Sequence, residues 1–152
     1  MEQAKSSVLI STKDSDGFRT GQLMAIRLRG MVALLVVEFI LGVTLGTFWA
    51  YDPTVTRQSG PVIVVLDIHM LLALGLLAGS ISAVIGAVRA KYAKLSASVI
   101  GLLCILGAMV GGEMVVSSSQ QNLGIFLMSL FFIAALLIYG RWLGEVMSTL
   151  KK

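Results

Sequence analysis

Four side chains that could do chemistry lie within long apolar stretches of the sequence: Glu38, Asp67, His69 and Glu113. Ionisable groups are costly inside a bilayer, so each of them is a candidate functional residue. A single cysteine excludes an intramolecular disulfide framework, and a single histidine excludes a two-histidine metal site within one chain. The sequence also lacks a phosphate-binding glycine loop and a zinc signature, and no serine or cysteine stands beside the single histidine. Nucleotide binding and hydrolytic catalysis are therefore not expected.

His69 is the strongest of these candidates for binding a cofactor. It stands about two helical turns inside its apolar stretch, and the small residue Ala73 follows one turn later. An imidazole is a common axial ligand of haem iron, and a small neighbour leaves room for a flat porphyrin between helices. The alternative is an interhelical hydrogen bond or a pH-sensitive histidine near the membrane surface. Asp67 lies about 200° around the helix from His69 and is expected to be an interfacial acid.

Glu38 is expected to point into a helix bundle. Gly42 and Gly46 follow at i+4 and i+8, so the three residues share one face, and small residues let neighbouring helices approach closely. The Glu38 carboxyl group could tune a cofactor or handle protons, or it could be a neutral, hydrogen-bonded acid that holds helices in register. Glu113 follows two glycines and is a candidate for the same catalytic or tuning roles, the alternative being an interfacial acid.

Methionine thioethers can serve as second ligands of a haem iron, although filling gaps in an apolar core is their commoner role. Met70, Met109, Met114 and Met128 lie inside the apolar stretches. The segment from Asn122 to Met128 is expected to form the wall opposite His69. Both end residues of that segment are therefore candidate cofactor contacts.

The elements that position these residues follow from the composition. The chain has 152 residues, of which 57% are hydrophobic and 13% charged, and its mean hydropathy is +0.91. A soluble domain carries about a quarter charged residues, and a disordered chain needs low hydrophobicity, so both classes are excluded. Four apolar stretches, about 30–50, 61–88, 95–116 and 123–143, can each cross ~30 Å of hydrocarbon as a helix. The sequence therefore predicts an all-α polytopic membrane protein.

The basic residues predict the orientation of the chain in the membrane. They lie before the first stretch, between the second and third, and around the end of the fourth: Arg19, Arg27, Arg29, Arg89, Lys91, Lys94, Arg141, Lys151 and Lys152. The positive-inside rule then gives an antiparallel four-helix bundle with both termini in the cytoplasm, and the net charge of +4 reflects membrane anchoring rather than nucleic-acid binding. Tyr139 and Trp142 are expected in the inner aromatic belt. Residues 1–27 are predicted to be a cytoplasmic tail, either disordered or bound to a partner, and residues 28–150 the transmembrane domain.

The segment Ile68-His69-Met70-Leu71-Leu72-Ala73, in a span that ends at Arg89, resembles the haem-binding helix of the haem A synthase family. The segments 40–46 and 105–111 both read Ile-Leu-Gly-x-x-x-Gly and are similar to that family's first and third helices. The resemblance covers about residues 30–143, one of the two bundles that family members commonly hold. It implies haem b near the outer face of a prokaryotic plasma membrane, in haem modification, terminal-oxidase assembly or electron transfer. A half-size relative is also expected to form a homodimer or join a larger membrane complex.

The sequence departs from that family at three places. The family's second histidine ligand would fall where this chain has Gln121 or Asn122, and its glutamate three residues before the first histidine would fall at Leu66. The cysteine pair that some members carry in an outer loop is absent. Three ligation modes stay open: His69 alone, His69 with a methionine, or one His69 from each of two chains. Two other functions stay open as well, a respiratory accessory subunit without its own cofactor and a transporter that uses Glu38 as a proton site.

Overall fold

The computed structural model describes residues 2–48, 60–89, 94–117 and 120–151, and nearly all of them are helical. The helices are α1 (Glu2–Phe48), α2 (Gly60–Arg89), α3 (Leu95–Ser117) and α4 (Gln121–Leu150). Within this described part, four helical segments are long and apolar enough to cross a membrane: Gly21–Leu45, Gly60–Val88, Leu95–Val116 and Gln121–Leu150. The prediction of an all-α chain with four helices long and apolar enough to cross a membrane is confirmed for the described residues. Lys91 and Lys152 lie outside the described residues.

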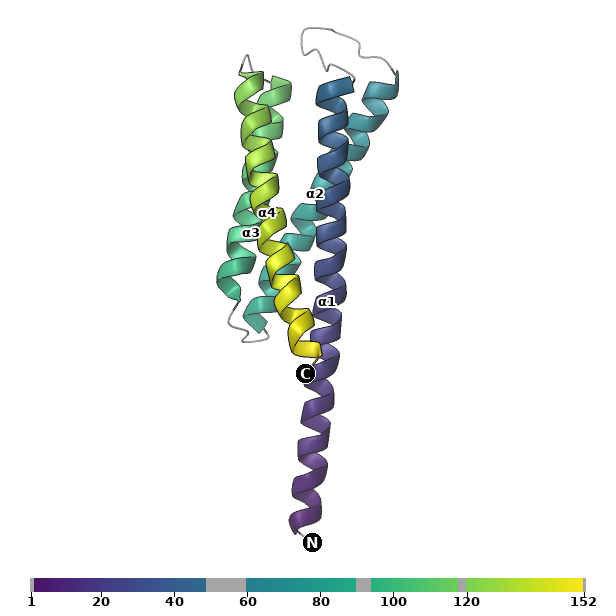
Figure 1. Cartoon of the computed structure of the whole chain (residues 1–152), viewed down its shortest axis with the longest axis vertical. Helices are drawn as coiled ribbons and strands as arrows, with labels where there is room; N and C mark the ends of the chain where they lie inside the picture. Colours follow the sequence, from purple (N-terminus) through teal and green to yellow (C-terminus); the bar gives the residue numbers. More distant parts are fainter. Residues whose placement is uncertain (1, 49–59, 90–93, 118–119, 152) are drawn as a thin grey trace.

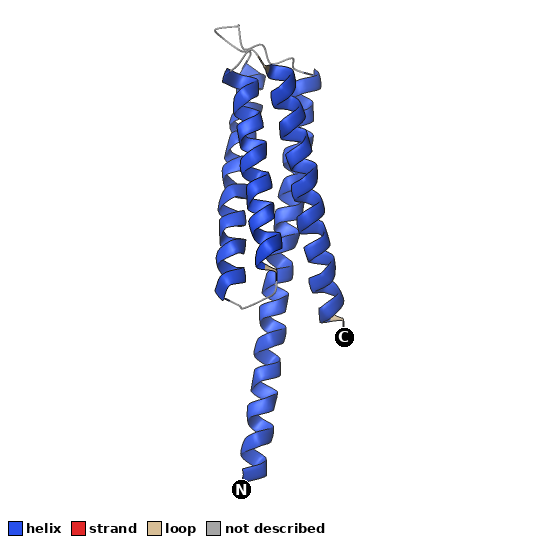
Figure 2. Cartoon of the chain, turned by 90° about the vertical axis from the view of Figure 1, so that its left-hand side faces the viewer, coloured by secondary structure: helices blue, strands red, loops and turns tan. Residues whose placement is uncertain are grey.

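The first span begins at Gly21, whereas the sequence predicted a start near Gly30. The difference arises because Arg27 and Arg29 point outward from the helix. Both arginines are exposed, while Ala25 and Leu28 on the opposite face are buried. Arginine can lay its aliphatic stem along an apolar surface and keep its charge near the interface, so it need not end a span. Residues 2–20 continue the same helix, which projects beyond the other three (Figure 1, Figure 2). Whether the tail binds a partner stays a prediction.

The four helices form a bundle in which each packs against its neighbours in the chain, and α4 also packs against α1. The described residues of the diagonal pairs, α1 with α3 and α2 with α4, do not come into contact. Figure 1 shows the ends of α1 and α3 and the beginnings of α2 and α4 at one end of the bundle. Residues near Phe48, Gly60, Ser117 and Gln121 therefore share one end, and those near Arg89 and Leu95 share the other.

Helices α3 and α4 make the closest contact in the bundle because glycines face each other there. A Cβ atom added at Gly111 would lie 2.5 Å from the backbone nitrogen of Met128, and one added at Gly124 would lie 2.7 Å from the carbonyl oxygen of Gly111. Small residues at such positions let two backbones touch, which is the usual way of packing helices where lipid offers no hydrophobic driving force. The backbone position of Met128 is therefore fixed by α3.

The apolar core fills the half of the bundle near the end of α2 and the beginning of α3. Tyr139 and Trp142 are 0% and 3% exposed, and their rings stack with centroids 6.4 Å apart. The expectation that both residues belong to an aromatic belt at the membrane surface is wrong, because both side chains point into the bundle. Gly101 makes this possible, since a Cβ atom there would lie 2.6 Å from the Tyr139 ring.

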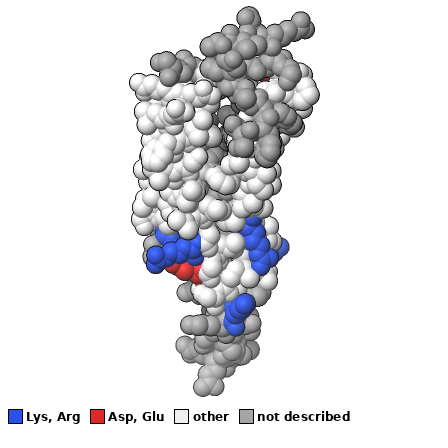
Figure 3. All heavy atoms as spheres, turned by 45° about the horizontal axis from the view of Figure 1, so that its top comes forward, with Lys and Arg blue, Asp and Glu red and all other residues white. Residues whose placement is uncertain are grey.

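Charged side chains gather at that same end. On the face shown in Figure 3, lysines and arginines form a band at one end of the apolar body. Lys94 and Arg141 both pair with Glu145 there, and an Arg29 nitrogen lies 3.1 Å from the Met147 sulfur. The apolar surface beyond this band, made of exposed leucine, isoleucine, valine and phenylalanine side chains, is the kind of surface that faces lipid.

Candidate functional site

A cavity of about 750 Å³ lies in the other half of the bundle, between the C-terminal halves of α1 and α3 and the N-terminal halves of α2 and α4. All four helices line it, mostly with apolar side chains. It forms where the helix pairs diverge, since glycine contacts hold α3 against α4 while the diagonal pair α2 and α4 do not touch. Ligand and cofactor sites have volumes of about 300–1,000 Å³ and a mainly apolar lining, so this cavity is large enough for a cofactor.

A buried acid and the only histidine of the chain meet at this cavity. The Glu38 side chain is 0% exposed, and its Oε1 atom lies 3.1 Å from Nδ1 of His69, whose side chain is 15% exposed. The approach is too oblique for a regular N–H···O hydrogen bond, and neither oxygen of Glu38 has another hydrogen-bond partner among the described residues. The structure therefore brings two ionisable residues from different helices into one close polar contact.

Glu38 and the hydroxyl of Tyr139 are both buried without a regular hydrogen bond among the described residues, and in this they differ from the buried polar side chains Ser80 and Ser98. These two serines donate hydrogen bonds of 2.8 and 2.9 Å to the carbonyl oxygens of Leu77 and Leu95 in their own helices. A buried polar group is costly unless it is hydrogen-bonded, and this holds more strongly for a carboxyl group. The unsatisfied oxygen atoms of Glu38 are a feature that packing alone does not explain.

The position of Glu38 follows from the buried seam of α1. The buried residues Leu28, Met31, Leu35, Glu38 and Leu45 are spaced by three, four or seven positions, which places them on one face of the helix. Glu38 thus occupies a position that an apolar residue would normally fill, and the seam turns it toward α2.

Gly42, one turn after Glu38, is the point of α1 that side chains of two other helices approach. A Cβ atom added at Gly42 would lie 3.5 Å from Cε1 of His69 and 3.6 Å from Cε of Met128. The imidazole of α2 and the thioether of α4 therefore approach the same point on α1. The sequence predicted that Gly42 shares a face with Glu38, but it did not predict this contact with the His69 ring.

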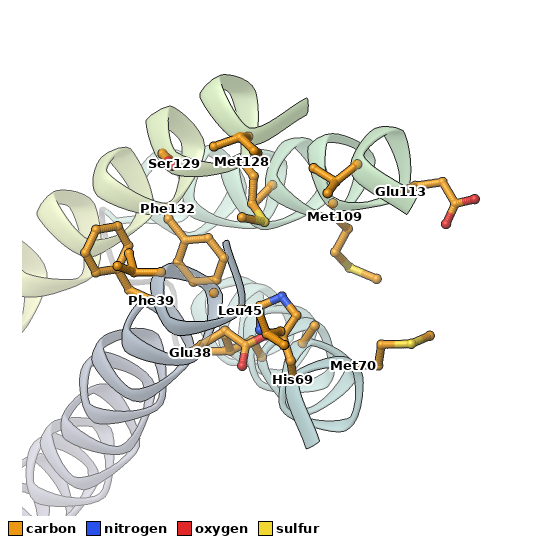
Figure 4. A pocket seen from close by; sticks show the side chains of 18 of the residues that line it. Glu38, Phe39, Leu45, His69, Met70, Met109, Glu113, Met128, Ser129 and Phe132 are labelled. Atoms are coloured by element: carbon orange, nitrogen blue, oxygen red, sulfur yellow. The ribbon is translucent and has the colours of Figure 1, made fainter. Parts of the chain in front are cut away.

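Figure 4 shows how His69 is turned within the cavity. One ring nitrogen faces Glu38, and the other points into the space between the helices, toward Met128 and Met109. Met70 lies at the mouth of the cavity, and Glu113 extends away from the His69 ring. Nδ1 of the imidazole thus lies beside the Glu38 carboxyl group, and Nε2 faces the cavity.

The structure brings the predicted site residues together. Besides Glu38 and His69, the cavity is lined by Ala73 from α2, Glu113 from α3, and Asn122 and Met128 from α4. Asp67 is exposed and is not part of the lining, as expected from its position around the helix. That these residues share one cavity is a fact of the structure, whereas their roles toward a cofactor stay predictions.

The pairing of Glu38 with His69 was not predicted, although the positions of the two residues in the sequence indicate it. Glu38 lies about ten residues before the end of α1 and His69 about ten after the beginning of α2, so both sit roughly 15 Å from that end of the bundle. Two ionisable residues at equal depth on consecutive helices are candidates for pairing, because each is costly alone in a bilayer.

The arrangement is suited to a metal that is held in a macrocycle and not to a bare metal ion. The described residues contain no group of three or more histidine, cysteine or acidic side chains that could hold a bare metal ion. A metal that already has ligands from a macrocycle needs only axial ligands from the protein. Histidines that bind metals almost always have their second ring nitrogen hydrogen-bonded to a carboxylate or carbonyl group, which orients the ring. Glu38 is placed to do this for His69.

Comparison of the chain with protein-family models, with curated proteins and with solved structures finds no match.

Proposed function

We propose that this protein is a membrane haem b-binding protein in which His69 is an axial ligand of the iron. The observation that supports it best is the contact of the buried Glu38 carboxyl group with Nδ1 of His69, while Nε2 faces a cavity of about 750 Å³. The resemblance of the segment around His69 to the haem A synthase family supports the same cofactor. Electron transfer, haem modification and terminal-oxidase assembly are the activities that this cofactor would serve.

The residues of the cavity fit the proposed group in several ways. His69 would bind the iron, and Glu38 would orient the imidazole and set which ring nitrogen carries the proton. Ala73, one turn from His69 on the same helix, is small and would leave room for a flat ring beside the imidazole. The apolar lining would exclude water, and Asn122 would form part of the opposite wall. A bound haem would supply one-electron redox chemistry, which none of these side chains provides alone.

The proposal includes a topology. We infer an antiparallel bundle with both termini in the cytoplasm of a prokaryotic cell, since Lys94, Arg141 and Lys151 lie near the end opposite to the cavity. The haem would then lie in the outer half of the plasma membrane. Since the chain resembles half of a haem A synthase, two copies, or this chain and a larger complex, would form the working unit.

An accessory subunit without a cofactor is the main alternative. It would give no role to the cavity of about 750 Å³ or to the His69 Nε2 atom that faces it. No comparable observation favours this alternative, nor the transporter that would use Glu38 as a proton site.

An absorption spectrum of the protein purified from haem-replete cells in mild detergent tests the proposal. We expect a Soret band, a haem b pyridine haemochrome, and loss of both in His69→Ala. Asp67→Asn is the matched control, because Asp67 is on the same helix but exposed and outside the cavity. A colourless wild-type protein that also fails to bind added haem b would overturn the proposal.

A further inference from the structure

We infer that the cavity is also a binding site for a membrane-soluble quinol, an aromatic ring that carries two hydroxyl groups and an apolar tail. One hydroxyl group would bind to His69, and the tail would leave the bundle toward the lipid. This inference goes beyond the proposed function and needs no metal. Quinol and haem would be alternative occupants of the same cavity, so either can be tested without the other.

The polar end of the site is the contact between Glu38 and His69. The buried carboxyl group of Glu38 lies 3.1 Å from Nδ1 of the imidazole and has no regular hydrogen bond among the described residues. A carboxylate at this place favours the imidazole proton on Nδ1, which leaves Nε2 with a lone pair. Nε2 faces the cavity, so it would accept a hydrogen bond from a ligand there. A hydroxyl group can donate that hydrogen bond, whereas a carbonyl or ether oxygen cannot.

The walls of the cavity around Nε2 are suited to an aromatic ring. Three methionines line it from three different helices: Met70 from α2, Met109 from α3 and Met128 from α4. Phe132 of α4 adds an aromatic side chain, and Figure 4 shows it on the same side of the site as Met128. Thioethers make favourable contacts with aromatic rings and adapt to irregular shapes, and aromatic rings attract one another. An aliphatic alcohol could bind to Nε2 as well, but it would gain none of these ring contacts.

The spacing of the side chains near Nε2 favours a small ring. His69 Cε1 lies 3.5 Å and the Met128 methyl carbon 3.6 Å from the position of a Cβ atom on Gly42, so the two side chains converge on one point of α1. A macrocycle bound by both residues therefore does not fit between them. A single six-membered ring is much smaller, and it would reach Nε2 from the open part of the cavity with the Met128 thioether beside it.

The cavity opens at the side of the bundle, where an apolar tail would leave it. Met70 and Leu74 line the cavity from α2, yet these side chains are 58% and 56% exposed. Phe39 lines it from α1 and is exposed as well. All three residues lie within segments that are apolar enough to cross a membrane, so this opening would face lipid and not water. A ligand with an apolar tail would therefore enter from the lipid and keep its tail there.

The experiment is an anaerobic calorimetric titration of the detergent-purified, haem-free protein with decylbenzoquinol. The oxidised quinone and the dimethyl ether of the same quinol are titrated in parallel, because neither can donate a hydrogen bond. We expect saturable binding of the quinol, about tenfold tighter than that of the other two ligands, since they leave Nε2 unpaired. His69→Leu should weaken quinol binding by about the same factor. Asp67→Asn is the matched control and should bind as the wild type does, because Asp67 is exposed and outside the cavity.

Three results would overturn the inference: no saturable binding of the quinol, equal or tighter binding of the quinone or the dimethyl ether, or unchanged affinity in His69→Leu. If His69→Leu does not fold, the three ligands on the wild type decide alone. Uptake of added haem b by the same preparation is followed separately by its Soret band. A protein that binds the quinol but no haem refutes the proposed function only, and one that binds haem but no quinol refutes this inference only.

Discussion

Replacing Glu38 by glutamine separates the proposed role of its carboxyl group from a structural one. Glutamine has nearly the same volume, so the substitution removes the acidic group and leaves no cavity in the seam of α1. The carboxyl group is fully buried and 3.1 Å from Nδ1 of His69, so solvent does not screen its effect on the imidazole. Losing a partner of a metal-bound histidine weakens metal binding by about 10- to 100-fold, which is about 1.4–2.7 kcal/mol.

The stability of the fold should change little or increase in the same variant. A buried carboxylate with one oblique partner is poorly compensated, and replacing it by a neutral group of similar size is often neutral or stabilising. The affinity for haem and the stability of the apo-protein are therefore expected to move in opposite directions. A residue that only held helices in register would lower stability and leave haem affinity unchanged.

The assay is a titration of the detergent-solubilised apo-protein with haem b, followed by the Soret band, beside thermal unfolding of the same samples. Glu113→Gln is the matched control, because Glu113 also lines the cavity but is exposed and extends away from His69. We expect its affinity to stay within about twofold of that of the wild type. If Glu38→Gln binds haem as tightly as the wild type does, Glu38 does not orient the ligand and the reasoning is wrong.

Three further predictions concern the packing of the bundle. Gly111→Ala should lower the free energy of unfolding in detergent by about 1–3 kcal/mol, because the new Cβ would lie 2.5 Å from the backbone of α4, whereas Gly75→Ala, with nothing within 4 Å, should not. Equal effects would refute this account of the α3–α4 contact. Tyr139→Phe should stabilise the protein by about 1 kcal/mol in an SDS-unfolding titration, because the buried hydroxyl has no partner among the described residues. A loss of stability would reveal a partner. Lys94→Ala should lower stability by less than about 1 kcal/mol and show little salt dependence, since its pair with Glu145 is partly exposed. A larger loss would place that pair in the core.

The four spans were predictable because each depends on one segment alone. A helix of about 20 apolar residues satisfies its own backbone and can cross the membrane whatever its neighbours are. The same local reasoning identified Glu38 and His69, since an ionisable residue in such a segment is exceptional in any arrangement. It was wrong for Tyr139 and Trp142, which were expected to face a membrane surface but point into the bundle. Depth along a helix is local information, whereas the direction of a side chain depends on which helices pack on which face.

The amino-acid sequence by itself determined the class of protein, the number of spans and the few residues able to do chemistry, because these follow from hydropathy and residue type along single helices. Only the tertiary structure decided that Glu38 meets His69, that Gly42 leaves room for His69 and Met128, and that the cavity lies between diverging helices. These contacts depend on the rotation and separation of helices. Close approach at Gly111 and Gly124 determines the rotation and separation of α3 and α4. No property of one helix alone determines where its neighbour will touch it.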